Sequence, residues 1–244
     1  MALLRIGSRE FSPALIVFDK DGTLIDFNFM WASWVVELAQ RLERAADVSL
    51  ARELYEAMGY DAARHNVIAG SPLAAHSMAN LFTLTARVIH KVGLSPDAAL
   101  RATNDAWFAP NPVTMARPLA DLPKLFSQLR ARAILIGVAT SDDRASTLET
   151  LRALGISEMV NALVSADDGL PNKPAPDMLL RVCEELNVAP ASALMVGDSV
   201  ADMQSARAAG IGFRVGVLSG VSSEPDLQKD ADTIVASVAA LMTN

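Results

Sequence analysis

Short apolar runs that alternate with amphipathic helical patterns constrain the fold of this chain more than any other feature. The runs occupy residues 15–18, 134–140, 160–164, 193–198 and 213–217, with a shorter candidate at 233–235. Strands that alternate with helices form βαβ units and a mostly parallel sheet. Helices on both faces of that sheet explain why the runs are apolar throughout rather than alternating. We therefore predict an α/β fold with a mostly parallel sheet sandwiched by helices.

The segment from residue 27 to residue 116 departs from this alternation, because it shows helical patterns and no run typical of a buried strand. Apolar residues at helical spacing predict helices over 31–46, 50–58, 74–92 and about 95–108. Prolines at 110, 112 and 118 close the segment, as expected for a linker. We predict two domains, a core from residues 1–26 and 117–244 and an inserted helical domain from residues 27–116. Within the insert, we expect the tryptophans in the apolar core, with a platform for a sugar or base and a dimer contact by an exposed pair as the alternatives: Trp31, Trp34 and Trp107.

The net charge of -7 over 244 residues excludes several classes of function. A protein that binds nucleic acid or an anionic membrane needs a basic face, so we expect neither partner. Any anionic ligand must be held by local devices such as a metal ion, single basic residues or helix N-termini. Cys183 is the single cysteine, which leaves no intrachain disulfide and no cysteine cluster for zinc. Without a signal-like or membrane-spanning apolar segment, we expect a cytoplasmic monomer or homodimer.

Polar residues end three of the predicted strands. Asp19 and Asp21 follow the first run, Thr140 ends the second, and Asp198 ends the run at 193–198. In parallel sheets the ligand crevice lies beyond the carboxyl ends of the strands, so these residues should share one edge. Two neighbouring carboxylates repel each other unless one is protonated or a cation binds, and a divalent metal is the simplest relief. The alternative is structural, with Asp21 in a turn and Asp19 as a local cap.

Two further features lie between and after these strand ends. Lys173 stands in a Lys-Pro loop, where a solvated charge is the ordinary explanation. Ser199 to Asp202 matches a capping-box pattern at the start of a helix, which needs no catalytic role. Taken singly, each residue has a structural explanation, but their order along one predicted sheet edge is harder to explain that way.

Together these residues resemble the four motifs of the haloacid dehalogenase (HAD) superfamily of phosphohydrolases. The motifs stand as Asp19-Lys20-Asp21-Gly22-Thr23, then Thr140, then Lys173, then Gly197-Asp198-Ser199-Val200-Ala201-Asp202. The resemblance covers about residues 15–27 and 117–217, and an insert directly after the first motif looks like the helical cap of the phosphoglycolate phosphatase-like branch. It implies a Rossmann-like catalytic core with an inserted α-helical cap domain. The implied activity is Mg²⁺-dependent hydrolysis of a small phosphate monoester, phosphoglycolate-like or a sugar phosphate.

The resemblance also implies roles for the acidic residues. Asp19 would be the nucleophile that forms an aspartyl-phosphate, and Asp21 would protonate the leaving alcohol and then activate water. Mg²⁺ would be held by Asp19, Asp198 and the backbone carbonyl of Asp21, since it prefers hard oxygen ligands. Asp202 is a further candidate for the metal site. Lys20 is assigned no role, because it lies on the opposite face if the strand continues.

The remaining motif residues would bind the phosphoryl group. Thr140 would hydrogen-bond it, with help from backbone N–H groups near Gly22 and Ser141, and Lys173 would supply the positive charge. The substrate would be a small phosphorylated metabolite. Its identity should be set by the insert, where the polar candidates are Arg64, His65, Asn66, His76 and Arg87.

Other activities of the superfamily fit less well. Dehalogenases lack the second acid, here Asp21, and phosphonate-cleaving members use a cap lysine, whereas no lysine lies between Lys20 and Lys91. Mutases of the β-phosphoglucomutase type usually carry a histidine on the first cap helix, and none occurs here before His65. A phosphomutase therefore remains an alternative. So does a non-enzymatic phospho-accepting signalling module, although such modules are shorter and lack the insert.

Overall fold

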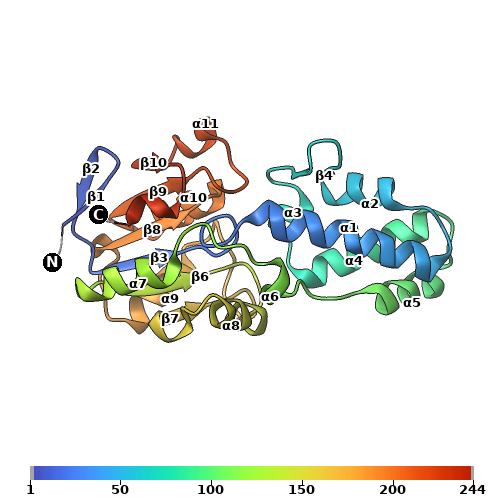
Figure 1. The fold of residues 1–244 in the computed structure, drawn as a ribbon, viewed down its shortest axis with the longest axis horizontal. Coiled ribbons are helices and arrows are strands. Elements are labelled where there is room, and N and C mark those ends of the chain that lie inside the picture. Colours follow the sequence, from blue (N-terminus) through green and yellow to red (C-terminus); the bar gives the residue numbers. More distant parts are fainter. Residues whose placement is uncertain (1–2, 243–244) are drawn as a thin grey trace. The chain divides into compact units, whose positions relative to one another are not determined.

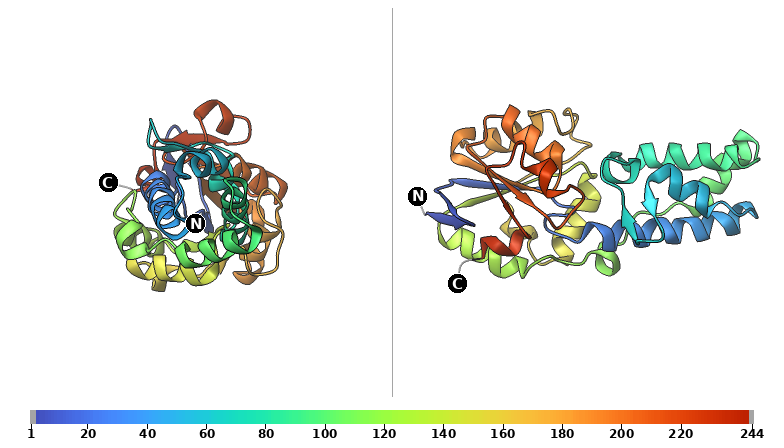
Figure 2. Two further views of the ribbon diagram at one scale, coloured as in Figure 1. Left: turned by 90° about the vertical axis from the view of Figure 1, so that its right-hand side faces the viewer. Right: turned by 90° about the horizontal axis from the view of Figure 1, so that it is seen from above.

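A six-stranded parallel sheet with helices on both faces organises one part of the chain (Figures 1 and 2). The computed structural model describes residues 3–242, without the side chains of residues 112 and 113. In chain order the strands of this sheet are β3 (Leu15–Phe18), β6 (Leu135–Ala139), β7 (Ala162–Val164), β8 (Ala193–Gly197), β9 (Phe213–Val217) and β10 (Thr233–Val235). Their order across the sheet is β10-β9-β8-β3-β6-β7, and every neighbouring pair is parallel. The predicted α/β fold is confirmed.

The register of the central strands brings the polar strand ends to one edge. Phe18, the last residue of β3, lies opposite Val138 of β6 and Val196 of β8. The backbone N–H of Asp19 continues this ladder by donating to the carbonyl oxygen of Val196 at 2.9 Å. The residues that follow β3, β6 and β8 therefore emerge side by side, at the carboxyl edge where ligands bind in such sheets.

Alternate residues of the sheet pack against different helices. Ile16 and Phe18 share one buried apolar cluster with α7 (Leu122–Ala131) and α8 (Arg144–Ala153). Leu15 and Val17 join the opposite cluster with α9 (Asp177–Glu185), α10 (Val200–Ala208) and the short α11 (Glu224–Leu227). Burial on both faces is why these strands read as continuous apolar runs. Three short 3₁₀ helices complete this part: η1 (Ser157–Met159), η2 (Pro190–Ser192) and η3 (Val238–Leu241).

An N-terminal hairpin precedes the sheet and was not predicted. Strands β1 (Leu4–Ile6) and β2 (Arg9–Phe11) pair antiparallel, and Leu4 and Ile6 are buried in the cluster that contains Ile16. The ring of Phe11 stacks on Phe213 of β9, with ring centroids 5.3 Å apart. Strands of three residues are too short to produce a recognisable alternation, so the sequence pattern does not predict this hairpin.

The chain divides into two compact units. The core unit comprises Met1–Phe27 and Ala116–Asn244, and the inserted unit comprises Asn28–Met115. The helices between the first and second strands of the main sheet are α1 (Phe27–Ala46), α2 (Ala51–Met58), α3 (Pro72–Ala75), α4 (Met78–Lys91), α5 (Pro96–Ala106) and α6 (Pro112–Met115). No helix among residues 3–242 is both long and apolar enough to cross a membrane. That the inserted unit serves as a cap stays a prediction.

The inserted unit differs from the predicted all-helical pattern in two places. A two-stranded antiparallel hairpin, β4 (Tyr60–Asp61) and β5 (Asn66–Val67), follows α2. The helix predicted over 74–92 is interrupted before Met78, because Ser77 caps α4 by accepting a hydrogen bond from the N–H of Asn80. A side-chain cap of this kind ends one helix and begins the next even where the apolar periodicity continues.

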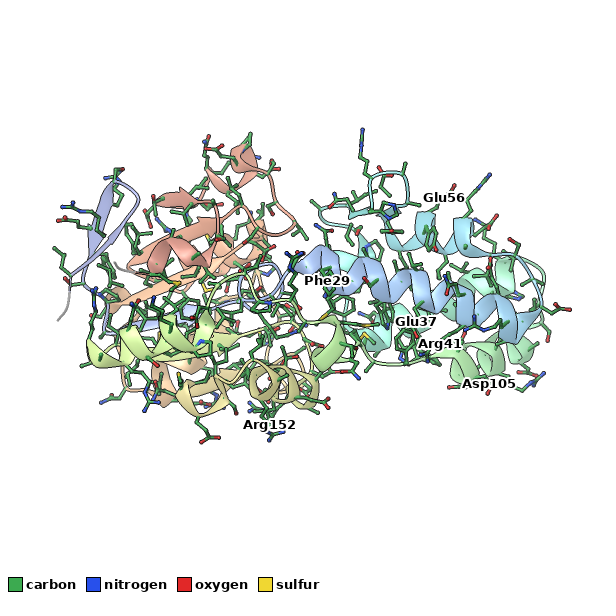
Figure 3. The ribbon with its side chains drawn as sticks, viewed as in Figure 1. Phe29, Glu37, Arg41, Glu56, Asp105 and Arg152 are labelled. Atoms are coloured by element: carbon green, nitrogen blue, oxygen red, sulfur yellow. The ribbon has the colours of Figure 1, made fainter. Side chains whose placement is uncertain are left out.

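Trp31 and Trp34 are buried in the interior of the inserted unit, as predicted, whereas Trp107 is half-buried. Trp34 is fully buried and makes edge contacts with Trp31 and Trp107, at centroid distances of 5.6 and 5.3 Å. Its indole N–H donates to the carbonyl oxygen of Phe108 at 2.9 Å. Arg41 lies one turn after Glu37 on α1 (Figure 3), and its guanidinium carbon is 3.8 Å from the centre of the Phe108 ring. These aromatic contacts leave no exposed indole platform on Trp34.

Candidate active site

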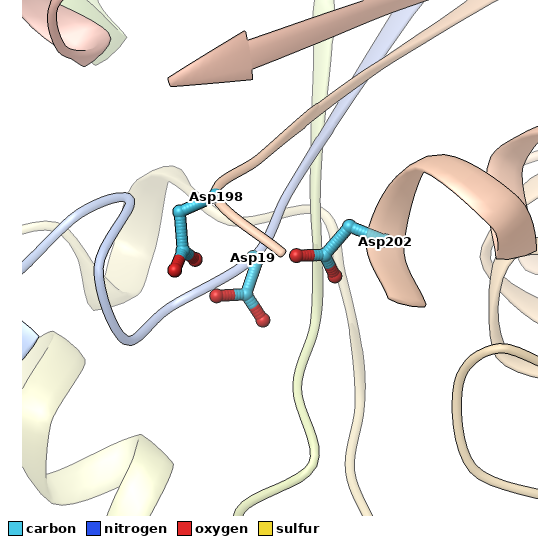
Figure 4. Close-up of side chains that lie close together, drawn as sticks. All are labelled: Asp19, Asp198 and Asp202. Atoms are coloured by element: carbon cyan, nitrogen blue, oxygen red, sulfur yellow. The ribbon is translucent and has the colours of Figure 1, made fainter. Parts of the chain in front are cut away.

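Three buried carboxylates converge at the carboxyl edge of the main sheet (Figure 4). Asp19 directly follows β3, Asp198 directly follows β8, and Asp202 lies in the first turn of α10. Each offers an oxygen within 4.8 Å of the other two, and the residues are only 8%, 2% and 1% exposed. Carboxylate oxygens are hard ligands, so this donor set fits a divalent cation such as Mg²⁺.

Lys173 places a positive charge in the same cluster. Its ammonium nitrogen lies 2.6 Å from Asp19 Oδ1 and 2.6 Å from Asp202 Oδ1, and it also donates to the carbonyl oxygen of Ala139 at 3.1 Å. The lysine side chain is almost completely buried, so it is not the solvated loop charge that its surroundings in the sequence would ordinarily indicate. The Lys-Pro loop is thus folded back onto the sheet edge.

Burial and mutual repulsion shift the pKa values in this cluster. Burial raises the pKa of Asp19 to about 7, with Lys173 opposing the rise and Asp202 adding to it. Burial also raises the pKa of Asp198 well above its usual range, and the nearby charges of Asp19 and Asp202 add to that rise. For Lys173, burial acts to lower the pKa, but Asp19 and Asp202 outweigh it and raise the pKa above its ordinary value. A cation bound between the carboxylates would favour their ionised forms.

Asp202 serves both as a helix cap and as a member of the carboxylate cluster. Its Oδ2 accepts hydrogen bonds from the backbone N–H and the hydroxyl of Ser199, while the Ser199 hydroxyl accepts from the N–H of Asp202. This reciprocal arrangement is a capping box at the start of α10. The other oxygen, Oδ1, pairs with Lys173. One oxygen therefore serves the predicted helix cap and the other pairs with Lys173, while the metal-site role of Asp202 stays a prediction.

Asp198 is held closely by the first motif. The hydroxyl of Thr23 donates to Asp198 Oδ1 at 3.3 Å. Gly22 has a φ of +87°, and a Cβ atom there would lie 2.5 Å from Asp198 Oδ2, so both the backbone and the space require glycine. The N–H of Gly22 donates to the carbonyl oxygen of Ile25. The phosphoryl contact expected near Gly22 stays a prediction.

Asp21 lies outside the carboxylate cluster and forms an ion pair with Lys20, for which the sequence predicts no role. Lys20 is fully buried, and its ammonium nitrogen lies 2.8 Å from Asp21 Oδ2 and 3.1 Å from Asp142 Oδ2. The lysine is therefore part of the site's electrostatics, although its backbone position indicated the opposite face. The predicted roles of Asp21, as acid and base and through its backbone carbonyl, stay predictions.

Thr140 and Ser141 follow β6 at the same edge of the sheet. Thr140 is buried, its N–H donates to the carbonyl oxygen of Val164, and its hydroxyl oxygen accepts from the N–H of Asp142 at 3.2 Å. Ser141 is half-buried in the bend that follows. The structure thus places both residues after the strand next to β3, as expected, and their contacts with a phosphoryl group stay predictions.

Sequence patterns did not single out several residues that support this site. Asp142, in the turn after β6, pairs with Lys20 and accepts a hydrogen bond from Ser146. The segment after β9 contacts Asp198 and Gly22 through Val221 and Ser219. Their position directly after a predicted strand is a signal for such a role, because residues that follow any strand of a parallel sheet emerge at the ligand-binding edge. The residues directly after β9 carry no acidic side chain, so no motif marks them in the sequence.

Comparisons with known proteins agree with the resemblance drawn from the four motifs. A family model described as a haloacid dehalogenase-like hydrolase matches residues 13–210. A phosphoglycolate phosphatase from Rhodospirillum rubrum is 30% identical to this chain over 220 residues, which cover 87% of this chain and 83% of that protein.

Solved structures share the fold. A HAD phosphatase from Thermococcus onnurineus superposes with a TM-score of 0.65 at 22% identity, covering 92% of this chain and 94% of that one. A β-phosphoglucomutase from Clostridium difficile gives a TM-score of 0.60 at 19% identity, covering 94% of this chain and 93% of that one. Because a phosphatase and a mutase match about equally well, these likenesses bear on the fold and not on the reaction.

Proposed function

This chain belongs to the haloacid dehalogenase-like hydrolase family, and on that premise we propose that it is a Mg²⁺-dependent phosphatase of small phosphate monoesters. The observation that carries the proposal is the position of Lys173, whose ammonium nitrogen lies 2.6 Å from both Asp19 and Asp202. A buried cation beside a cluster of carboxylates combines a nucleophile with positive charge for the phosphoryl oxygens, as phosphoryl transfer requires.

In the first step, a carboxylate oxygen of Asp19 attacks the phosphorus atom. The bond between phosphorus and the ester oxygen breaks, and Asp21 gives its proton to the leaving alkoxide, which departs as an alcohol. The product on the protein is an aspartyl-phosphate on Asp19. The position of Asp19 directly after the central strand supports this role, because that strand is fixed by the ladder on both sides.

In the second step, the carboxylate of Asp21 takes a proton from water while the water oxygen attacks the phosphorus of the aspartyl-phosphate. The acyl-phosphate bond breaks, Asp19 is restored, and inorganic phosphate leaves. Asp21 is then protonated again, ready for the next substrate. The two residues are separated by Lys20 alone, so both lie at the end of the same strand.

Charge neutralisation is divided between Lys173 and the metal site. Lys173 would contact an oxygen of the phosphoryl group, with hydrogen bonds from Thr140 and Ser141. Asp19, Asp198 and Asp202 would hold the cation. When bound, Mg²⁺ supplies positive charge that offsets the repulsion between the carboxylates and the phosphate.

For the substrate, we propose 2-phosphoglycolate or a similarly small phosphate ester. The support is the R. rubrum relative, a phosphoglycolate phosphatase that covers most of this chain. A sugar phosphate is the broader alternative. Among the polar residues of the inserted unit that would contact the leaving group, Arg64 has an 84% exposed side chain, whose guanidinium lies 3.5 Å from a carboxylate oxygen of Asp61.

A non-enzymatic signalling module and a phosphomutase fit these findings unequally. Membership of a hydrolase family does not fit the signalling module, which we do not retain. A phosphomutase would share the aspartyl-phosphate but return the phosphate to a second hydroxyl, so it is distinguished by its product. No contact in the described residues favours it over hydrolysis.

The test is release of inorganic phosphate from a panel of phosphate monoesters, with and without Mg²⁺. We expect multiple turnovers on at least one small ester, abolished in Asp19→Asn, which preserves the shape of the side chain but removes the nucleophile. Asp105→Asn is the matched control, since Asp105 is exposed on α5 in the inserted unit (Figure 3). Undiminished turnover in Asp19→Asn, or an isomerised ester without phosphate release, would rule the proposal out.

A further inference from the structure

The segment directly after β9 closes around Asp198. The backbone N–H of Val221 donates to Asp198 Oδ2 at 2.8 Å, and the N–H of Ser222 donates to the carbonyl oxygen of Asp198 at 3.3 Å. The hydroxyl of Ser219 donates to the carbonyl oxygen of Gly22 at 2.7 Å. Three residues of one short segment thus reach both the first and the last of the four motifs.

Gly220 lies between these contacts and touches the carboxylate itself. A Cβ atom built on Gly220 would lie 1.9 Å from Asp198 Oδ2, 2.2 Å from its Cγ and 2.5 Å from its Cβ. The φ of Gly220 lies outside the left-handed region that favours glycine. Glycine is therefore required here for space alone. Removing that space would displace the whole Asp198 side chain, since even its Cβ is too close.

The Asp198 carboxylate is consequently held between two glycines from distant parts of the chain. A Cβ on Gly22 would approach the same Oδ2 atom to 2.5 Å, from the loop that follows β3. The hydroxyl of Thr23 fixes the other oxygen, Oδ1. Close approach on both sides, with one hydrogen bond to each oxygen, leaves the carboxylate little rotational freedom.

We propose that Ser219, Gly220 and Val221 form a positioning loop that orients Asp198 toward a divalent cation and thereby sets the cation affinity of the site. The inference rests on the proposed function only through the metal site, and it makes no claim about the substrate. Partners that orient a metal ligand typically change metal affinity by about 10- to 100-fold when they are removed. The loop supplies such partners without contributing a charged group.

Gly220→Ala tests this directly through binding of Mg²⁺ alone to the full-length chain. Titration calorimetry, and the rise of the thermal midpoint with Mg²⁺ concentration, both report cation affinity without turnover. We expect the dissociation constant for Mg²⁺ to increase at least about tenfold, with the far-ultraviolet circular dichroism unchanged. A folded Gly220→Ala that binds Mg²⁺ as the wild type does would overturn the inference.

Two alanine variants serve as matched controls. Leu218→Ala removes an exposed side chain from the same segment, and Gly216→Ala adds a Cβ on β9 whose nearest neighbour, 3.2 Å away, is the flexible end of Leu227. Both should bind Mg²⁺ within about twofold of the wild type, because neither alters the surroundings of Asp198. A tenfold loss in either control would show that Mg²⁺ affinity follows general stability, and would overturn the specific role of the loop.

Ser219→Ala keeps the inference testable if Gly220→Ala does not fold. It removes only the hydrogen bond to Gly22 and should weaken Mg²⁺ binding about two- to tenfold. Unchanged affinity in this variant would overturn the inference in that case. A wild-type chain that does not bind Mg²⁺ would overturn the proposed metal site and the inference with it, whereas normal binding in every variant would remove the inference alone.

Discussion

The ammonium nitrogen of Lys20 lies 2.8 Å from Asp21 Oδ2, and the lysine side chain has no exposed surface. A second carboxylate oxygen, Asp142 Oδ2, lies 3.1 Å from the same nitrogen. Burial acts to lower the pKa of Lys20, but the charges of Asp21 and Asp142 outweigh it and raise the pKa above its ordinary value. One buried cation thus joins the end of β3 to the turn after β6.

Lys20→Met should strongly destabilise the chain. The substitution keeps the volume but leaves the carboxylates of Asp21 and Asp142 without their cation, which typically costs about 3–5 kcal/mol for a buried pair. Denaturant unfolding measures the loss. Lys124→Met on the exposed surface of α7 is the control and should change stability by less than about 0.5 kcal/mol. Equal small losses in both variants would mean that the buried pairing contributes little.

The pH dependence of stability should report the raised pKa of Asp19. In the folded chain this pKa is about 7, against a usual value of 3.8, so between these values the folded chain holds a proton that the unfolded chain has lost. Stability from this group is therefore present at low pH and is lost as the pH rises toward 7. In Mg²⁺-free buffer at pH about 8, Asp19→Asn should unfold a few degrees above the wild type.

That difference should shrink toward pH about 5, where Asp19 is protonated in the folded wild type. Added Mg²⁺ should raise the thermal midpoint of the wild type more than that of Asp19→Asn, because the amide is a weaker ligand for a hard cation. Thermal unfolding across pH, with and without Mg²⁺, measures both effects. If Asp19→Asn had the same thermal midpoint as the wild type at every pH, the raised pKa of Asp19 would be contradicted.

The two oxygens of Asp202 should be separable by mutation. Asp202→Asn keeps an oxygen that can accept the capping hydrogen bonds, but it removes the charge that faces Lys173, so we expect kcat/KM to fall at least about tenfold with little loss of stability. Ser199→Ala breaks the capping box and should cost about 1 kcal/mol of stability with activity largely retained. Phosphate release and denaturant unfolding on both variants measure the two effects. A loss of stability in Asp202→Asn with activity retained would show that Asp202 acts only as a helix cap.

The core unit should fold without the insert. Ile25 and Pro118 form an antiparallel bridge. Beside it, the N–H of Asp26 donates to the carbonyl oxygen of Arg117. The N–H of Leu119 likewise donates to the carbonyl oxygen of Leu24. The chain therefore leaves and re-enters the core unit at adjacent points, which a short Gly-Ser linker can join. Replacing residues 28–115 in this way should give a cooperatively unfolding protein that still binds Mg²⁺. A core unit that is unfolded, or that folds but does not bind Mg²⁺, would contradict this prediction.

The elements found from the sequence were those whose burial leaves a pattern within a few residues. β3 and β8 are buried on both faces and read as unbroken apolar runs, and the Ser199–Asp202 capping box was visible from its spacing alone. The hairpins β1–β2 and β4–β5 have strands of two or three residues, too short for a period of two to emerge. The break before α4 depended on Ser77 competing as a cap within a continuous helical pattern.

The sequence by itself determined which side chain ends each central strand, and hence which chemistry meets at the sheet edge: Asp19 after β3, Thr140 after β6 and Asp198 after β8. That follows because parallel strands present their carboxyl ends together whatever the intervening loops do. Only the tertiary structure decided that Lys173 bridges Asp19 and Asp202, and that Gly22 and Gly220 enclose Asp198. Such contacts join segments far apart in the chain, and their distances depend on how loops pack, which local periodicity does not encode.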